Sequence, residues 1–177
     1  ETGLRAPALT GHSMGGTLAM MVAARQPSRV GRLMVVEMLP APAGLFGSSA
    51  TDIRPLADAL ASVFASSPEL LGSLLGGFGG EEESGKKSLR EGVARATHEL
   101  ALTDLTAELA KIRAPMQVVY ATPAPGGAVD PASVTRNYRA SYAKAKAELI
   151  AVANSGHMIM YDQPARFRAA VKSFLSK

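Results

Sequence analysis

A serine with the spacing of a catalytic nucleophile lies near the start of this chain, in the segment Gly11-His12-Ser13-Met14-Gly15. The Gly-x-Ser-x-Gly spacing is typical of a nucleophile elbow, a strained turn between a strand and a helix that exposes the serine hydroxyl. We expect both glycines to be required, because side chains two positions either side of the serine would crowd the backbone. The alternative is a glycine-rich turn with a solvated serine, since so short a pattern also arises by chance.

A serine hydroxyl is a weak nucleophile until an imidazole accepts its proton and a carboxylate stabilises the charged imidazole. The chain has three histidines, and His157 is the candidate general base because it lies between a predicted strand and a predicted helix. The alternative for His157 is that it only caps this loop. His12 is next to Ser13, where neighbouring side chains point away from each other, and His98 is predicted to be a surface or packing residue.

The flanking segments predict the strand and the helix that a nucleophile elbow requires. Residues 6–10 are short and apolar enough for a buried strand. The helix after the serine is predicted from four apolar residues that share one helical face: Met14, Leu18, Met21 and Val22.

Three further strands are predicted at residues 30–37, 116–121 and 147–153. A helical segment over residues 132–145 separates the last two, and a final helix begins at about Asp162, its predicted N-cap. The alternation of strands and helices favours a parallel sheet covered on both faces.

A long insertion, residues 39–112, separates the second and third predicted strands and has a helical pattern. The predicted organisation is therefore a first core part at 1–38, this insertion, and a second core part at 113–177. The glycine-rich and charged segment 76–88 is predicted to be a mobile hinge or tip. We expect the insertion to form a lid, with a simple cover for the sheet as the alternative. Its amphipathic faces are marked by Ile53, Leu56, Leu60, Val63 and Phe64, and by Leu89, Val93 and Ala96.

The composition is that of a folded chain with few special binding features. The 177 residues carry a net charge of +4 without a basic stripe interleaved with aromatic residues, so nucleic acid is not an expected partner. The chain has no cysteine and its histidines are scattered, so neither a metal nor another cofactor is expected. No apolar run is long enough to span a membrane. Because the chain begins at Glu1 rather than at a methionine, the sequence predicts no cellular location.

The order of these elements resembles the C-terminal half of an α/β-hydrolase, the superfamily of serine esterases and lipases. The resemblance covers nearly the whole chain, including LTAELAKIRAPMQVVYA before the third strand and NSGHMIMYDQPARF after the fourth. It implies an α/β fold, a truncated α/β-hydrolase with about four mainly parallel strands flanked by helices and a helical cap insertion. The N-terminal strands of the family have no counterpart here.

The resemblance also implies roles for the candidate residues, with Ser13 as nucleophile and His157 as base. An acid after the seventh strand of the family would be Asp130, which lies about four positions later than the family pattern. An acid after the sixth strand would be Glu37, and the two remain rivals. The backbone N–H of Met14 is the one assignable oxyanion donor, because the loop that carries the second donor has no counterpart.

The function implied is hydrolysis of small apolar carboxylic esters through an acyl-serine intermediate. The alternative is a catalytically impaired fragment that self-associates or binds a missing N-terminal segment. Without the N-terminal strands, residues 6–11 would form an exposed apolar edge that invites another chain. We therefore expect a homo-oligomer, most simply a two-fold dimer in which the partner covers Ser13.

Overall fold

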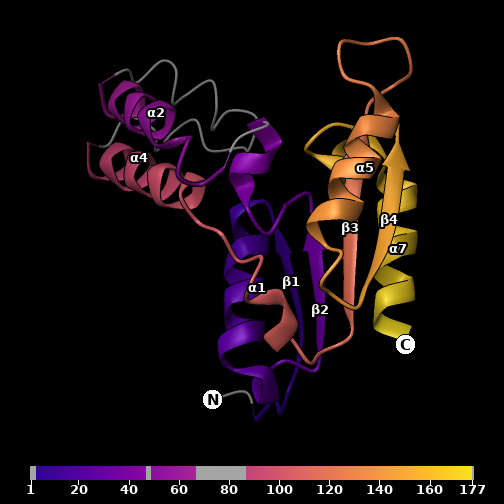
Figure 1. Cartoon of the computed structure of the whole chain (residues 1–177). Coiled ribbons are helices and arrows are strands. Elements are labelled where there is room, and N and C mark those ends of the chain that lie inside the picture. The colour runs from indigo at the N-terminus through magenta and orange to yellow at the C-terminus, as the bar shows by residue number, and fades with distance from the viewer. Residues whose placement is uncertain (1–2, 47–48, 67–86, 177) are drawn as a thin grey trace. The chain divides into compact units, whose positions relative to one another are not determined.

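The computed structural model describes residues 3–46, 49–66 and 87–176. The chain divides into two compact units, one made of Glu1–Pro40 with Leu105–Lys177 and the other of Ala41–Asp104 (Figure 1). Residues 39–40 and 105–112, which the sequence assigns to the insertion, thus belong to the first unit. The chain leaves and re-enters this unit at adjacent points, since the Leu105 N–H donates to the Pro40 carbonyl at 2.9 Å.

The first unit is built on a four-stranded parallel sheet in the order β1-β2-β3-β4. The strands are β1 Ala8–His12, β2 Arg32–Val36, β3 Met116–Thr122 and β4 Ala147–Ala153. The predicted α/β class, with about four parallel strands flanked by helices, is confirmed. Strand β1 begins two residues later than predicted, after a residue with positive φ at Ala6.

Helices connect the strands and cover both faces of this sheet (Figure 1). Helix α1, Met14–Arg25, links β1 to β2, and α5, Pro131–Ser141, links β3 to β4. Two helices follow β4: α6 at Ile159–Asp162 and α7 at Pro164–Ser176. Short 3-10 turns occupy Pro27–Arg29 (η1) and Leu109–Lys111 (η4).

Alternate residues of the central strands pack on the two faces, as the period of a strand requires. Met34 and Val36 belong to the cluster on the α7 side, which also contains Val119, Ala121, Val152, Ile159, Ala170 and Phe174. Val35 points the other way, toward α1, where its side chain lies against Gly16. Both central strands are buried on both faces, which is why they read as continuous apolar runs.

Helix α1 does not pack through the residues that predict it. Its buried side is made of small residues and one methionine: Gly16, Thr17, Ala19, Met20, Ala23 and Ala24. Met14, Leu18 and Val22 are instead 43%, 53% and 42% exposed. The apolar stripe seen in the sequence therefore faces outward from this unit.

The second unit contains η2, Pro42–Phe46, and two helices that pack against each other, α2 at Arg54–Ser66 and α4 at Lys87–Ala101. Ile53, Ala57 and Ala94 are buried in it. The predicted hinge at 76–88 falls almost entirely outside the described residues, and the role of the insertion as a lid stays a prediction. No described helix of either unit is both long and apolar enough to cross a lipid bilayer.

Candidate active site

Ser13 occupies a strained turn between β1 and α1. Its backbone has φ 54° and ψ −128°, a conformation that costs free energy for any residue with a side chain. Backbone hydrogen bonds hold it: the Ser13 N–H donates to the Val36 carbonyl at 2.9 Å, and the Ser13 carbonyl accepts from the N–H groups of Gly16 at 2.7 Å and Thr17 at 3.3 Å. The segment Gly11 to Gly15 thus forms the strained strand-to-helix turn that a nucleophile elbow requires.

The glycines around Ser13 are not equally constrained. A Cβ on Gly11 would collide with the backbone of Gly15 and lie 2.6 Å from the nitrogen of Gly16. A Cβ on Gly16 would lie 3.1 Å from Val35 Cγ1, whereas a Cβ on Gly15 would meet no atom within 4 Å. The expectation that Gly15 must be small is therefore wrong; Gly11 and Gly16 are the crowded positions.

His157 lies in a loop that is anchored on both sides. The Ser155 N–H donates to the Thr122 carbonyl at 3.2 Å, which ties the loop to the end of β3. The Gly156 N–H donates to Asp162 Oδ2 at 2.8 Å. Asp162 is the last residue of α6, and α7 begins at Pro164, so the prediction that Asp162 caps the final helix is wrong. Its carboxylate supports the histidine loop instead.

His12 contacts this loop directly. Its Nε2 lies 2.9 Å from the carbonyl oxygen of His157, and the two imidazole rings have centroids 4.6 Å apart with planes inclined at 46°. Burial, and the positive charge that His12 can carry, both lower the pKa of His157. No local pattern in the sequence indicates this contact, because it joins segments 145 residues apart.

Glu37 follows β2 directly and also has positive φ, at 52°. Its N–H donates to the Val119 carbonyl at 2.8 Å, and its Oε2 accepts a 2.5 Å hydrogen bond from the N–H of Ala121. The Tyr138 hydroxyl lies 3.3 Å from Oε1 and donates to it. Burial raises the pKa of Glu37 to about 7, although both hydrogen bonds act to lower it.

Tyr138, which contacts this carboxyl group, lies between two further tyrosines. Tyr138 stacks on Tyr120 with ring centroids 4.3 Å apart, and on Tyr142 at 6.4 Å. The Tyr142 hydroxyl donates to the Met38 carbonyl at 2.7 Å. Burial and the charge of Glu37 raise the pKa of Tyr138, so its hydroxyl stays protonated and available as a donor. No sequence pattern indicates Tyr138, because only the fold brings α5 beside the end of β2.

Asp130, the rival acid, is the N-cap of α5. Its two carboxylate oxygens accept hydrogen bonds from the N–H groups of Ala132 at 3.1 Å and Ser133 at 2.9 Å. A guanidinium nitrogen of Arg136 lies 3.6 Å from Oδ2 of Asp130, and both side chains are largely exposed. Capping accounts for the contacts of both oxygens.

Ser13, Glu37 and His157 follow β1, β2 and β4, so the parallel sheet places all three at its carboxyl-terminal edge. Met14 opens α1, where the first N–H groups have no acceptor within the helix and the helix dipole favours an anion. His98 lies in α4 of the other unit, with its Nε2 2.7 Å from Asp58 Oδ1. Within the described ranges, no three His, Asp or Glu side chains are grouped so as to hold a metal ion.

Comparison with known proteins also indicates an alpha/beta hydrolase. The model of the alpha/beta hydrolase family matches residues 1–170. A hydrolase from Pseudomonas aeruginosa PA01 is 24% identical with a TM-score of 0.65, over 95% of this chain and 64% of its own. The enol-lactonase from Burkholderia xenovorans LB400 is 21% identical with a TM-score of 0.59, over 95% of this chain and 65% of its own.

NosK from Streptomyces actuosus is 23% identical with a TM-score of 0.61, over 94% of this chain and 67% of its own. The chain therefore spans about two thirds of the length of these solved structures. At such identities the likeness concerns the fold. A search of curated proteins found no match.

Proposed function

The chain belongs to the alpha/beta hydrolase family, and from this premise we propose that it is a serine hydrolase that cleaves small carboxylic esters with apolar acyl groups. The strained conformation of Ser13 at the start of α1 is the observation that carries the proposal. Such strain has a cost that packing must offset, and it presents a hydroxyl to a substrate at the N-terminus of a helix.

In the proposed reaction, Ser13 Oγ attacks the ester carbonyl carbon while His157 takes the hydroxyl proton. The Met14 N–H donates to the developing oxyanion. When the tetrahedral intermediate collapses, the bond to the alkoxide oxygen breaks and His157 returns the proton to the departing alcohol. Water then attacks the acyl-serine by the same sequence, which releases the acid and restores Ser13.

For the carboxylate that stabilises the charged His157, we propose Glu37. It is largely buried at the same sheet edge, and its neighbour Val36 accepts the hydrogen bond from Ser13. Asp130 already has a structural role as the N-cap of α5, which supports the choice of Glu37. Glu37 must be ionised to act, so we expect activity to rise with pH through about 7.

Two observations bear on the substrate class. The helical insertion is rich in leucine and other apolar residues, which suits an apolar acyl group if it covers the site. The similar structure from Burkholderia is an enol-lactonase, and a lactone is a cyclic ester. The insertion thus supports an apolar acyl group, and the enol-lactonase supports an ester as the bond that is cleaved.

A fluorophosphonate probe tests the proposal, because it reacts with an activated serine and not with an inert one. We expect mass spectrometry to find one label, on Ser13, and none in Ser13→Ala. Hydrolysis of a short-chain p-nitrophenyl ester should disappear in the same variant. An unlabelled Ser13 in the folded wild-type chain would contradict the proposal.

The second candidate is a catalytically impaired chain whose main property is self-association or binding of a separate N-terminal segment. It is favoured by one observation: among the described strands, β1 pairs only with β2, so its other edge has no strand beside it. Leu4, at 68% exposed, and the exposed Val22 line a groove beside β1. Leu18, which is also exposed, lies one helical turn before Val22 on α1. We propose a two-fold dimer through this edge, which is compatible with either function.

A further inference from the structure

We infer that His12 is a positioning residue that ties the strand carrying the nucleophile to the loop carrying the general base. The inference rests on the proposed function, since it assigns His12 a role in the same site. It rests on geometry: His12 is the residue before Ser13, and its Nε2 lies 2.9 Å from the carbonyl oxygen of His157, 145 residues away in sequence.

The hydrogen bond involves the backbone of His157 and not its ring. A carbonyl oxygen only accepts hydrogen bonds, so Nε2 of His12 must carry the proton. This bond therefore fixes the distance between β1 and the histidine loop without competing for the ring nitrogens that transfer the proton. A displacement of about 1 Å between nucleophile and base can lower a rate by about 100-fold, so such a bond has catalytic value.

His12 also acts on His157 through charge. With ring centroids 4.6 Å apart, a proton on one imidazole disfavours a proton on the other. At this edge of the sheet, the other titratable groups on the described neighbouring elements include Glu37 after β2, and Asp162 and the exposed Tyr161 in α6. Of these, Glu37 accepts from Ala121 and Tyr138, and Asp162 accepts from the histidine loop. The charge interaction that lowers the pKa of His157 is that with His12.

Two substitutions separate the hydrogen bond from the charge. In His12→Gln, the amide nitrogen can reach the same carbonyl oxygen but carries no charge at any pH. In His12→Leu, both the donor and the charge are lost. We expect His12→Leu to lower kcat by about tenfold or more with little change in KM, and His12→Gln to recover most of that loss. Thermal unfolding of both variants checks that each is folded.

The second readout does not need catalysis. The chain has three histidines, so NMR titration of their ring protons can be assigned with single His→Gln variants. We expect the pKa of His157 to rise in both His12 variants, because a positive neighbour has been removed. His98→Gln, in the other unit, is the matched control and should leave the pKa of His157 unchanged.

The two readouts distinguish the inference from the proposed function. If the fluorophosphonate fails to label Ser13, the proposed function is wrong whatever the titrations show. If Ser13 is labelled but His12→Leu keeps the wild-type kcat and His157 keeps its pKa, the role of His12 is refuted. A raised pKa together with rescue by glutamine supports it.

Discussion

The carboxyl group of Glu37 is subject to two opposing requirements. As a triad acid it must be ionised, because only a carboxylate stabilises the charged His157. Burial favours the protonated form and raises the pKa of Glu37 to about 7. The hydrogen bonds from the Ala121 N–H and the Tyr138 hydroxyl lower this pKa, but by less than burial raises it. In the proposed reaction, Glu37 therefore links activity and stability to pH in opposite directions.

Replacing each rival acid by its amide tests which one acts on His157. Glu37→Gln should lower kcat on a p-nitrophenyl ester at pH 8 by roughly 10,000-fold, the effect of amide replacement at a triad acid. Asp130→Asn should keep kcat within about twofold of wild type, because asparagine is as good an N-cap as aspartate for α5. The reverse pattern would move the acid to Asp130.

The raised pKa of Glu37 also predicts how the free energy of unfolding varies with pH. Its pKa is higher in the folded chain, about 7, than its ordinary value of 4.5, so the folded state binds more protons between these values. The stabilising contribution is thus complete below about 4.5 and is lost as pH rises through about 7, by up to about 3 kcal/mol. Glu37→Gln removes this titration.

Urea unfolding of wild type and Glu37→Gln at several pH values between 4.5 and 8 measures the effect. The difference in free energy of unfolding between the two proteins should shift in favour of the variant as the pH rises. A difference that stays constant over this range would show that Glu37 is not perturbed by burial.

At the scale of elements, the turn at Ser13 depends on the close approach of the Gly11 backbone to the backbone of Gly15 and Gly16. Gly11→Ala should destabilise the fold by about 3 kcal/mol or more, because its Cβ collides with backbone atoms that cannot rotate away. Gly15→Ala is the matched control, since its Cβ meets open space and alanine favours a helix. We expect its free energy of unfolding to be unchanged or higher by up to about 1 kcal/mol.

Urea unfolding of the two variants side by side makes this comparison. Equal destabilisation by both substitutions would mean that the turn tolerates no side chain at either glycine. A stable Gly11→Ala would show that β1 and α1 can separate without loss of the fold.

The elements were largely predictable because apolar runs and turn residues are local signals. The strand at 147–153 was predicted with its observed bounds, and the turn at Ser13 was predicted from its spacing together with the apolar patterns on either side. Spacing cannot say which glycine is crowded, so Gly15 was misjudged. Periodicity shows that α1 has an apolar stripe but not what covers it, and the stripe proves to face outward.

The candidate site was less predictable, because its contacts join distant segments. The candidates Ser13 and His157 follow from local motifs. The bond from His12 to His157 depends on how β1 and the loop after β4 are brought together. The link from Glu37 to Tyr138 depends likewise on the packing of α5. No pattern of neighbouring residues encodes either contact.

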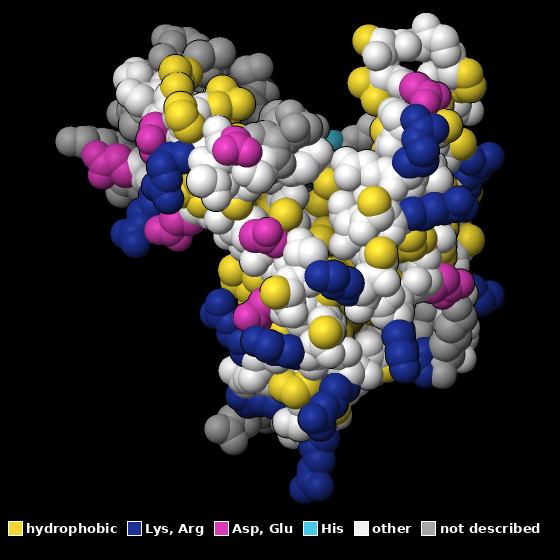
Figure 2. Space-filling view, in the orientation of Figure 1, with side chains coloured by type: hydrophobic (Ala, Val, Ile, Leu, Met, Phe, Trp, Pro, Cys, Tyr) yellow, Lys and Arg dark blue, Asp and Glu magenta, His cyan; other side chains and the backbone are white. Residues whose placement is uncertain are grey.

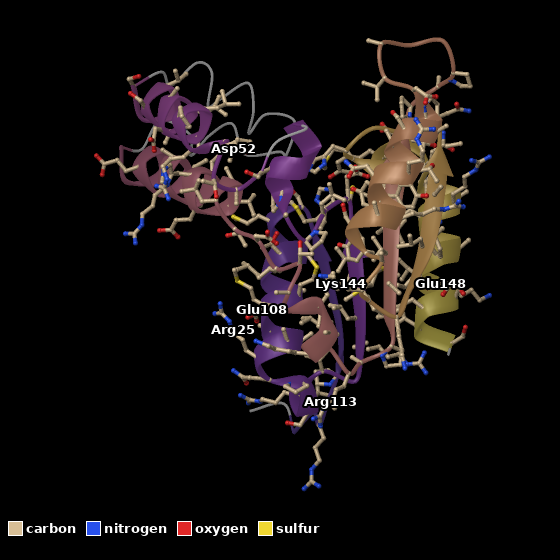
Figure 3. All side chains as sticks on the ribbon, in the orientation of Figure 1. Arg25, Asp52, Glu108, Arg113, Lys144 and Glu148 are labelled. Carbon is tan, nitrogen blue, oxygen red and sulfur yellow. The ribbon has the colours of Figure 1, made fainter. Side chains whose placement is uncertain are left out.

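At the scale of the whole molecule, the charges on the visible face are scattered. Figure 2 shows Lys and Arg side chains interspersed with neutral ones and not gathered in a stripe. Arg25, at the end of α1, projects outward (Figure 3). Arg5 and Arg29 line a groove beside β1 together with apolar residues such as Leu9 and Val22. Association through this edge would therefore bury apolar surface and bring like charges together.

This combination predicts a dimer whose strength increases with salt. Ions screen the repulsion between arginines and leave the burial of apolar surface in place. The dissociation constant of the dimer should therefore fall between low salt and about 0.5 M. Light scattering at micromolar protein should give twice the mass of one chain.

Leu18→Glu places a charge on the exposed stripe of α1 and should yield monomers. Leu175→Glu is the matched control: this leucine is 64% exposed on α7, away from β1, and its variant should stay dimeric. A wild-type monomer at all salt concentrations, or a Leu18→Glu dimer, would place the interface elsewhere or remove it.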